Sequence, residues 1–244
     1  CTFHENLIQS GLGLGVVLVD QGSHKLVNCI LLANRSSSSY SLYSAISCRS
    51  STNLTLMGCL IAGNQCRGVS TASGNTLTII NSTIAQNLVP YSSTGAGVNI
   101  PTGTLTVRNS ILWANGSTGT ESTQITVPAG SVIENNCIQG WTGTLSGTGN
   151  HGYNPRFADM DGADDVLGTA DDDYRLGEGS PCIDTGLNSA LPADIADLDN
   201  DGDTTEPLPL DLAGSARLFD EPSMPDVGRD REAFVDLGAM EAHN

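Results

Sequence analysis

The first half of the chain repeats a short pattern of apolar and polar positions that ends in an asparagine. In the stretch NSILWAN, residues 109–115, a large apolar side chain stands three positions before the final Asn and a small side chain stands five positions before it. Four similar stretches precede it at intervals of 23 to 30 residues, and they end at Asn6, Asn34, Asn64 and Asn87. A nearly constant interval of this length, combined with short apolar segments, is typical of solenoids built from stacked coils.

Two further apolar segments precede the asparagine pattern in each repeat, and both alternate. Residues eight and ten positions before the final Asn are mostly apolar, for example Leu54 and Leu56 before Asn64. The other apolar segment comes earlier in each repeat, at residues 15–19, 44–48, 68–72 and 97–101. Apolar and polar residues alternate in this way in a β-strand that has one buried face, because successive side chains point to opposite faces. Leucine-rich repeats share the interval, but they need a helical half that is absent from this pattern.

The pattern therefore predicts an all-β chain. We expect residues 1–150 to form a right-handed parallel β-helix of about five to six coils, with about three short strands in each coil. The recurring Asn predicts a ladder, because equivalent residues of adjacent coils lie about 4.8 Å apart, at which distance side-chain amides hydrogen-bond from coil to coil. Asn also tolerates the left-handed conformation of a tight turn.

A second stack, of small residues, is expected next to this turn. Its members stand five positions before each final Asn and are Cys1, Cys29, Cys59, Ser82 and Ser110. We expect the cysteines of this stack to be buried free thiols that act as small apolar side chains. Cys1 is in register with the stack, so the given sequence begins inside a coil. Because an uncovered coil exposes strand edges and apolar core, we expect further coils or a second subunit to cover it.

The composition changes after residue 150, which predicts a second region over residues 151–244. Residues 125–141 still alternate but have lost the final Asn, and the repeat then ends. Residues 151–244 carry 23 of the 27 acidic residues, whereas residues 1–150 are nearly neutral. We expect an irregular, loop-rich acidic segment that packs on the last coils. Its charge disfavours nucleic acid as a partner and favours divalent cations or simple solvation.

Short motifs of this acidic segment occur in a characteristic order. They are N-P-x-F at 154–157, D-Y-R-L at 173–176, S-P-x-I-D-x-G at 180–186, D-x-x-G-x-x-R at 211–217 and D-x-G-A-x-E at 236–241, after the ILW of 111–113. Together they resemble the segment that closes many large secreted bacterial β-helix proteins, associated with the choice-of-anchor Q type. The resemblance covers residues 109–244. It implies a β-helix fold and a secreted or cell-surface location, and it implies no single activity.

Two acidic clusters are candidate calcium sites. Closely spaced carboxylates repel one another unless they are solvated or bridged by a cation, and Ca²⁺ takes about six to eight oxygen ligands in loose geometry. The second cluster begins like an EF-hand loop, D-x-D-x-D-G, but Leu208 stands where that loop has a bidentate Glu, and we expect Glu206 to replace it. The alternative for each cluster is a solvated loop. The candidate ligands are Asp159, Asp161, Asp164, Asp171 and Asp173 in the first cluster and Asp197, Asp199, Asp201, Asp203 and Glu206 in the second.

The remaining cysteine, histidine and tryptophan residues show no spacing typical of a site. The chain has seven cysteines but no CxxC, and four scattered histidines without HExxH, so the sequence predicts no zinc site. Trp113 and Trp141 are expected to seal the last coil rather than to stack on a sugar. We expect Asp236 to cap backbone groups, with the tail around Glu241 packed as a strand on the last coil.

No apolar run reaches the roughly 18 residues of a membrane span. Glycoside hydrolysis needs carboxylates about 5–9 Å apart, and the four acidic residues of 1–150 stand far apart in the repeat. The signatures G-H-G and R-x-K of polygalacturonases are absent. A pectate lyase needs acidic calcium ligands next to a basic residue, and the coils show no such group. The coils are therefore predicted to carry no active site.

Two functions stay open from the sequence. The preferred hypothesis is an extracellular or cell-surface protein, structural or adhesive, with a calcium-stabilised C-terminal segment. Its candidate partners are divalent cations, carbohydrate, and copies of itself stacked end to end in a larger assembly or filament. The alternative is the C-terminal part of a polysaccharide lyase or glycoside hydrolase whose active site lies on coils that this sequence does not contain.

Overall fold

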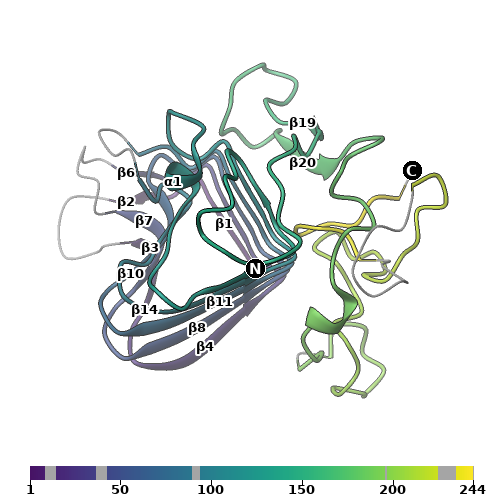
Figure 1. Cartoon of the computed structure of the whole chain (residues 1–244), viewed down its shortest axis with the longest axis horizontal. Coiled ribbons are helices and arrows are strands. Elements are labelled where there is room, and N and C mark those ends of the chain that lie inside the picture. Colours follow the sequence, from purple (N-terminus) through teal and green to yellow (C-terminus); the bar gives the residue numbers. More distant parts are fainter. Residues whose placement is uncertain (9–14, 37–42, 90–93, 196, 225–234, 244) are drawn as a thin grey trace.

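The protein is a parallel solenoid with an irregular segment along one flank (Figure 1). The computed structural model describes residues 1–8, 15–36, 43–89, 94–195, 197–224 and 235–243. Helical structure in these residues is confined to two single turns, α1 (Glu121–Gln124) and η1 (Asn188–Ala190). The fold is thus all-β, as the alternating pattern predicts.

Three parallel sheets form the walls of the solenoid. The first sheet contains, in spatial order, β1 (Thr2–His4), β5 (Ile30–Leu32), β9 (Leu60–Ala62), β12 (Thr83–Ala85), β15 (Ile111–Trp113) and β18 (Cys137–Ile138). The second contains β3 (Gly15–Val19), β7 (Ser44–Cys48), β10 (Arg67–Thr71), β13 (Val98–Asn99) and β16 (Ile125–Thr126). The third contains β4 (Gly22–Val27), β8 (Thr52–Met57), β11 (Asn75–Ile80), β14 (Gly103–Arg108) and β17 (Val132–Glu134).

Two short pairs of strands lie outside these walls. The parallel pair β2 (Leu7–Ile8) and β6 (Arg35–Ser36) follows the first sheet's turn, and the antiparallel pair β19 (Phe157–Asp159) and β20 (Asp173–Leu176) belongs to the C-terminal segment. The N-P-x-F motif ends at Phe157, the first residue of β19, and the D-Y-R-L motif forms β20.

The interior is filled by columns of apolar side chains in exact coil-to-coil register. In the third sheet Leu54, Leu77 and Leu105 pair directly with one another, and all three are buried. Their neighbours Thr55 and Thr78 point the other way, which is the alternation expected of a sheet with one face toward the core. Because each buried Leu contributes about 1.5–3 kcal/mol, these columns supply much of the solenoid's stability.

The first sheet differs because both of its faces are buried. The middle residues of its strands, such as Ile61 and Ile84, point into the solenoid core. The outer residues, such as Leu60 and Ile111, pack instead against the C-terminal segment. This explains why the segments ILL, LIA and ILW are apolar throughout and do not alternate.

The predicted asparagine ladder is confirmed. The Nδ2 atom of each of Asn6, Asn34, Asn64 and Asn87 donates to the Oδ1 atom of the next ladder Asn, at 2.8 to 2.9 Å. From Asn34 onward the same Nδ2 atom also donates to a main-chain carbonyl of the preceding coil, for example that of Ile61 for Asn87. The ladder therefore satisfies polar backbone at a turn that water does not reach.

One detail of the ladder prediction was wrong. The left-handed conformation belongs to the residue before each ladder Asn, with φ between 51° and 62°, and not to the Asn itself. These left-handed residues are Glu5, Ala33, Gly63, Gln86 and Ala114. The Asn must keep its side chain turned along the stack to bond the next coil, so the preceding residue absorbs the reversal of the chain.

The ladder ends at a glutamine that the sequence pattern did not reveal. The Oε1 atom of Gln124 accepts bonds from Asn115, at 3.0 Å from its main-chain N and 2.9 Å from Nδ2. The single turn α1 brings this longer side chain to the next rung position. The stack of small residues also continues further than expected, because Asn136 accepts from the Ser110 amide and Asn150 accepts from the Asn136 amide.

We expect Asn87→Leu to lower the free energy of unfolding by about 1–3 kcal/mol, because the Ile61 carbonyl and the neighbouring amides lose buried partners. Urea unfolding followed by circular dichroism measures this change. Asn53→Leu is the matched control, since Asn53 is exposed on β8. Equal stability of the Asn87 variant and the wild type would show that the ladder does not stabilise the coils.

Candidate functional site

The C-terminal segment lies along the outer face of the first sheet (Figure 1). It meets a second row of turn residues, each directly before the stack of small residues and each with a left-handed backbone. The row consists of Asn28, Gly58, Asn81, Asn109 and Asn135. Sequence analysis missed this row, although the recurring pairs Asn-Cys, Gly-Cys and Asn-Ser were visible in the repeat.

The asparagines of this second row hold the C-terminal segment by hydrogen bonds to its main chain. Asn109 makes a reciprocal pair with Leu187, whose N–H donates to Oδ1 and whose carbonyl accepts from Nδ2, both at 2.9 Å. Asn28 donates to the carbonyl of Asp211 at 2.9 Å, and Asn81 donates to that of Asp236. Contacts to three separate coils fix the segment along the solenoid.

A buried arginine organises the end of the C-terminal segment. The Arg217 guanidinium is fully buried and forms an ion pair with Glu241 at 2.8 Å. It also donates to the carbonyls of Gly238 and Ala239. Gly58 lies against it, at a position where a Cβ atom would overlap Oδ1 of Asn28 and lie 3.3 Å from Nη2 of Arg217. The D-x-x-G-x-x-R and D-x-G-A-x-E motifs therefore meet at one ion pair.

Asp236 caps backbone groups, as expected. Its two carboxylate oxygens accept the N–H groups of Asp184 and Ala242 at 2.8 and 2.7 Å. Burial raises the pKa of its carboxyl to about 7, and burial raises that of Glu241 as well. The tail itself is not a strand, which corrects the prediction: its residues 235–242 form bends that bond the coils through Thr83 and Asn109.

The second acidic cluster gathers part of the predicted calcium ligands. Carboxylate oxygens of Asp197, Asp199 and Asp201 lie within 4.8 Å of one another, and Asp199 also forms such a group with Asp194 and Glu206. The Oδ1 atom of Asp197 accepts the N–H of Gly202, which closes the loop as the D-x-D-x-D-G pattern suggests. Burial raises the pKa of Glu206, and the carboxylates of Asp201 and Asp199 raise it further.

Two residues of this loop differ from the predicted ligand set. Asp194 is buried and was missed by the sequence analysis, since it stands before the D-x-D-x-D-G pattern. Asp203 lies outside both groups, and its Oδ1 atom accepts bonds from the N–H and hydroxyl of Thr205. The Thr205 hydroxyl lowers the pKa of the Asp203 carboxyl.

The first acidic cluster forms the loop between β19 and β20, and its carboxylates bond within that loop. The structure brings no three of its donor atoms within 4.8 Å, whereas it does so twice in residues 194–206. Asp164 accepts from Val166 and Asp171 accepts from Asp164, while Asp173 pairs with Arg175. Asp159 and Asp161 form no group of three donors with these residues. Burial raises the pKa of the Asp159 carboxyl, and the neighbouring Asp161 raises it further.

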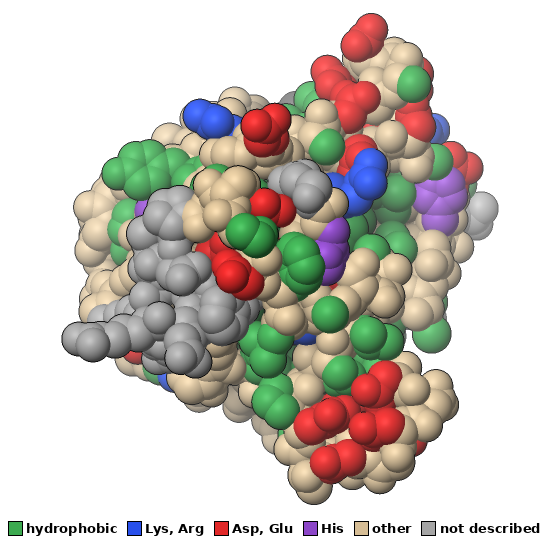
Figure 2. Space-filling view, turned by 90° about the vertical axis from the view of Figure 1, so that its right-hand side faces the viewer, with side chains coloured by type: hydrophobic (Ala, Val, Ile, Leu, Met, Phe, Trp, Pro, Cys, Tyr) green, Lys and Arg blue, Asp and Glu red, His purple; other side chains and the backbone are tan. Residues whose placement is uncertain are grey.

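The two acidic loops protrude at the top and bottom of the face in Figure 2.

Two acidic residues of the coils, Glu121 and Glu134, have structural partners. Glu134 forms an ion pair with Arg108 at 3.1 Å, and Glu121 accepts from the N–H and hydroxyl of Thr142. A cavity of about 900 Å³ beside β3 and β4 has a mainly apolar lining, and Asp20 is the one acidic residue among the described residues that line it. A single carboxylate does not supply the pair that glycoside hydrolysis uses.

Comparison with known families agrees with this architecture. A family model described as "Right handed beta helix region" matches residues 1–156. The chain belongs to this right-handed β-helix family. The match covers the coils of the β-helix and ends at the start of the acidic segment. No curated protein matches the chain significantly. Within the described residues, no helix has the length and apolar character that crossing a membrane requires.

The pKa of Asp236 predicts how the stability of this β-helix depends on pH. Because the folded state holds the Asp236 proton up to about pH 7 and the ordinary value is 3.8, the unfolded state binds fewer protons between these values. The free energy of unfolding therefore falls as the pH rises from about 4 to about 7. In Asp236→Asn this part of the pH dependence is expected to disappear.

Urea unfolding of both proteins at several pH values measures the difference in slope. Asp220→Asn, at an exposed position of the same segment, is the control and should keep the wild-type slope. An Asp236→Asn variant with an unchanged pH dependence would show that Asp236 is ionised across this range.

Proposed function

We propose that this chain is a structural or adhesive part of an extracellular or cell-surface β-helix protein, with a C-terminal segment stabilised by calcium. The observation that carries the proposal is the convergence of carboxylates in residues 194–206. Asp199 belongs to both groups of three, so the two groups together place five carboxylates around one short loop. Hard oxygen donors on a turn containing Gly202 match the ligand preference of Ca²⁺.

The charge of this loop supports a cation. Burial raises the pKa of Glu206, and the carboxylates of Asp201 and Asp199 raise it further, as expected where like charges share one loop. A bound Ca²⁺ ion would offset this repulsion and hold the residues between η1 and Leu208 in place.

The solenoid supports the structural part of the proposal. The ladder and the apolar columns stiffen the coils over their length, and the segment packs on the outer face of the first sheet from β5 to β18. The extracellular location follows from the resemblance of residues 109–244 to the closing segment of secreted β-helix proteins. Carbohydrate and further copies of the chain are the partners that such a surface would meet.

We expect 2 mM Ca²⁺, roughly 2- to 20-fold above the dissociation constants of about 0.1–1 mM typical of extracellular calcium modules, to raise the melting temperature by about 1 to 7 °C relative to excess EDTA. Asp199→Ala combined with Asp201→Ala should remove this shift, because it removes the one donor that the two groups share and a second donor of the group formed with Asp197. Asp164→Ala combined with Asp171→Ala, in the other acidic loop, is the matched control and should keep it. Calorimetric titration gives the stoichiometry.

The two loops can be told apart by this comparison. A shift that persists in the Asp199/Asp201 variant and is lost in the Asp164/Asp171 variant would place calcium in the loop between β19 and β20. An absent shift in the wild type would contradict calcium stabilisation and leave both loops as solvated acidic surface.

Incubation with a panel of neutral and acidic polysaccharides tests whether the protein cleaves carbohydrate. We expect no new reducing or unsaturated ends, because Glu121 and Glu134 are held by Thr142 and Arg108. Retention on an immobilised polysaccharide without cleavage would support an adhesive role. Cleavage that is abolished by Glu121→Gln or Glu134→Gln would contradict the proposal and show that the coils carry an active site.

A further inference from the structure

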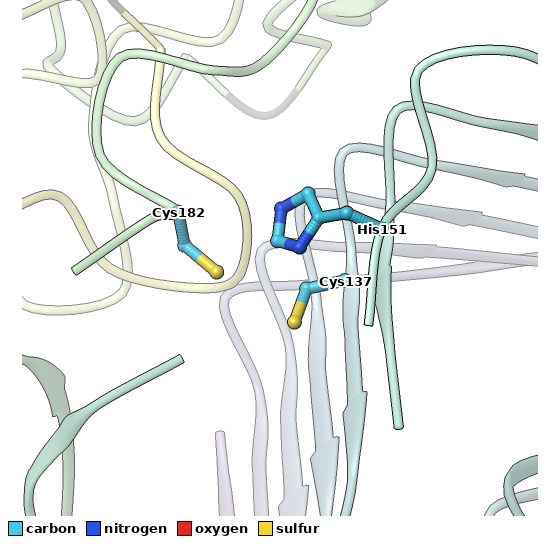
Figure 3. Close-up of side chains that lie close together, drawn as sticks. All are labelled: Cys137, His151 and Cys182. Carbon is cyan, nitrogen blue, oxygen red and sulfur yellow. The ribbon is translucent and has the colours of Figure 1, made fainter. Parts of the chain in front are cut away.

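Two cysteines and one histidine meet where the last coil contacts the C-terminal segment. Cys137 lies in β18, and an isolated parallel bridge places His151 on the next rung of the same sheet. Cys182 comes from the S-P-x-I-D-x-G motif of the C-terminal segment. One donor atom of each residue lies within 4.8 Å of the other two. Figure 3 shows the three side chains converging on the same small space.

The imidazole of His151 supplies an independent observation. Its Nε2 atom is buried and has no hydrogen-bond partner within the described structure. A buried polar atom without a partner is rare because it loses its bond to water and gains nothing in return. The ring is held in place, since it stacks on Tyr153 at 5.4 Å and its Nδ1 atom lies 3.4 Å from the Tyr153 N–H.

Both cysteines are also fixed by their surroundings. Cys137 and Cys182 are fully buried free thiols in the apolar cluster that joins the last coil to the segment. The main chain of Cys182 is held on both sides, because its N–H donates to Ser180 and its carbonyl accepts from Leu237. The three donors are therefore positioned before any ligand binds.

We propose that Cys137, His151 and Cys182 bind one zinc-type divalent ion that joins the last coil to the C-terminal segment. Thiolate and imidazole are the donors that Zn²⁺ prefers, whereas Ca²⁺ prefers oxygen. In a tetrahedral zinc site the donors lie about 3.5–3.8 Å apart, so small side-chain rotations from the observed spacing suffice. The site is chemically distinct from the carboxylates of residues 194–206.

The structure also indicates how the coordination is completed. The Cys137 thiol lies 3.2 Å from the carbonyl oxygen of Tyr153, which makes that oxygen or a water molecule the candidate fourth ligand. On binding, each thiol gives its proton to solvent and its sulfur lone pair to the ion, and two protons are released per ion.

Titration with Co²⁺ tests the site with a visible probe. The wild-type protein is kept anaerobic without reductant and saturated with Ca²⁺, so that carboxylate loops do not compete. We expect one equivalent of Co²⁺ to produce the thiolate charge-transfer and tetrahedral d–d absorption bands, and Zn²⁺ to displace it with release of about two protons. The melting temperature should rise with either ion.

Variants identify the ligands. Cys182→Ser and His151→Asn should each weaken Zn²⁺ binding by more than the roughly 10- to 100-fold loss typical of a residue outside the ligand shell. Cys66→Ser is the matched control, because Cys66 is a buried free thiol elsewhere in the coils and should leave binding unchanged. Melting curves without metal establish that each variant is folded.

Three results would overturn the proposal. The first is the absence of a thiolate charge-transfer band in the folded wild type. The second is a band that persists in Cys182→Ser. The third is a Cys137–Cys182 disulfide in the protein as isolated, found by thiol counting and peptide mass mapping, since oxidised sulfurs cannot both serve as thiolate ligands.

Discussion

The need to satisfy buried backbone groups at the turns governs this structure. A coil that turns three corners leaves carbonyls and amides between its strands without ladder partners, and the next coil excludes water from them. The asparagine ladder from Asn6 to Asn115 resolves this on one edge, because the amides of Asn34, Asn64 and Asn87 each bond both the next Asn and a carbonyl of the preceding coil. Coil spacing, strand register and the apolar columns all depend on this repeated contact.

The second row of asparagines applies the same chemistry to a different purpose. Asn28, Asn81 and Asn109 direct their amides outward, to the main chain of the C-terminal segment. The segment in turn buries the outer face of the first sheet and surrounds Arg217 with its ion-pair partner and two carbonyls. Removing one member of a buried pair usually costs about 3–5 kcal/mol, so the short motifs of this segment are tied to one another through that contact.

The segment presents two kinds of donor at separate places. Residues 194–206 gather hard carboxylate oxygens on an exposed loop, and the junction with the last coil gathers thiols and an imidazole in an apolar cluster. The exposed carboxylates suit a Ca²⁺ ion that exchanges with the solvent. The buried thiols and imidazole suit a zinc-type ion that links the last coil to the segment. In both cases an ion would strengthen the attachment or order of the segment, which is consistent with the proposed structural role.

The sequence by itself determined the solenoid, its strands and the ladder, because identical coils repeat the same local constraint and periodicity makes that constraint visible at Leu54, Leu77 and Leu105 or at successive Asn residues. It also indicated that Asp197, Asp199 and Asp201 share a loop. Only the tertiary structure decided what lies far apart in the chain. Gln124 ends the ladder, Asp194 joins Glu206, Arg217 meets Glu241, and Cys182 approaches Cys137 and His151. These contacts occur once each and depend on how a non-repeating segment folds back on the coils, so no period in the sequence records them.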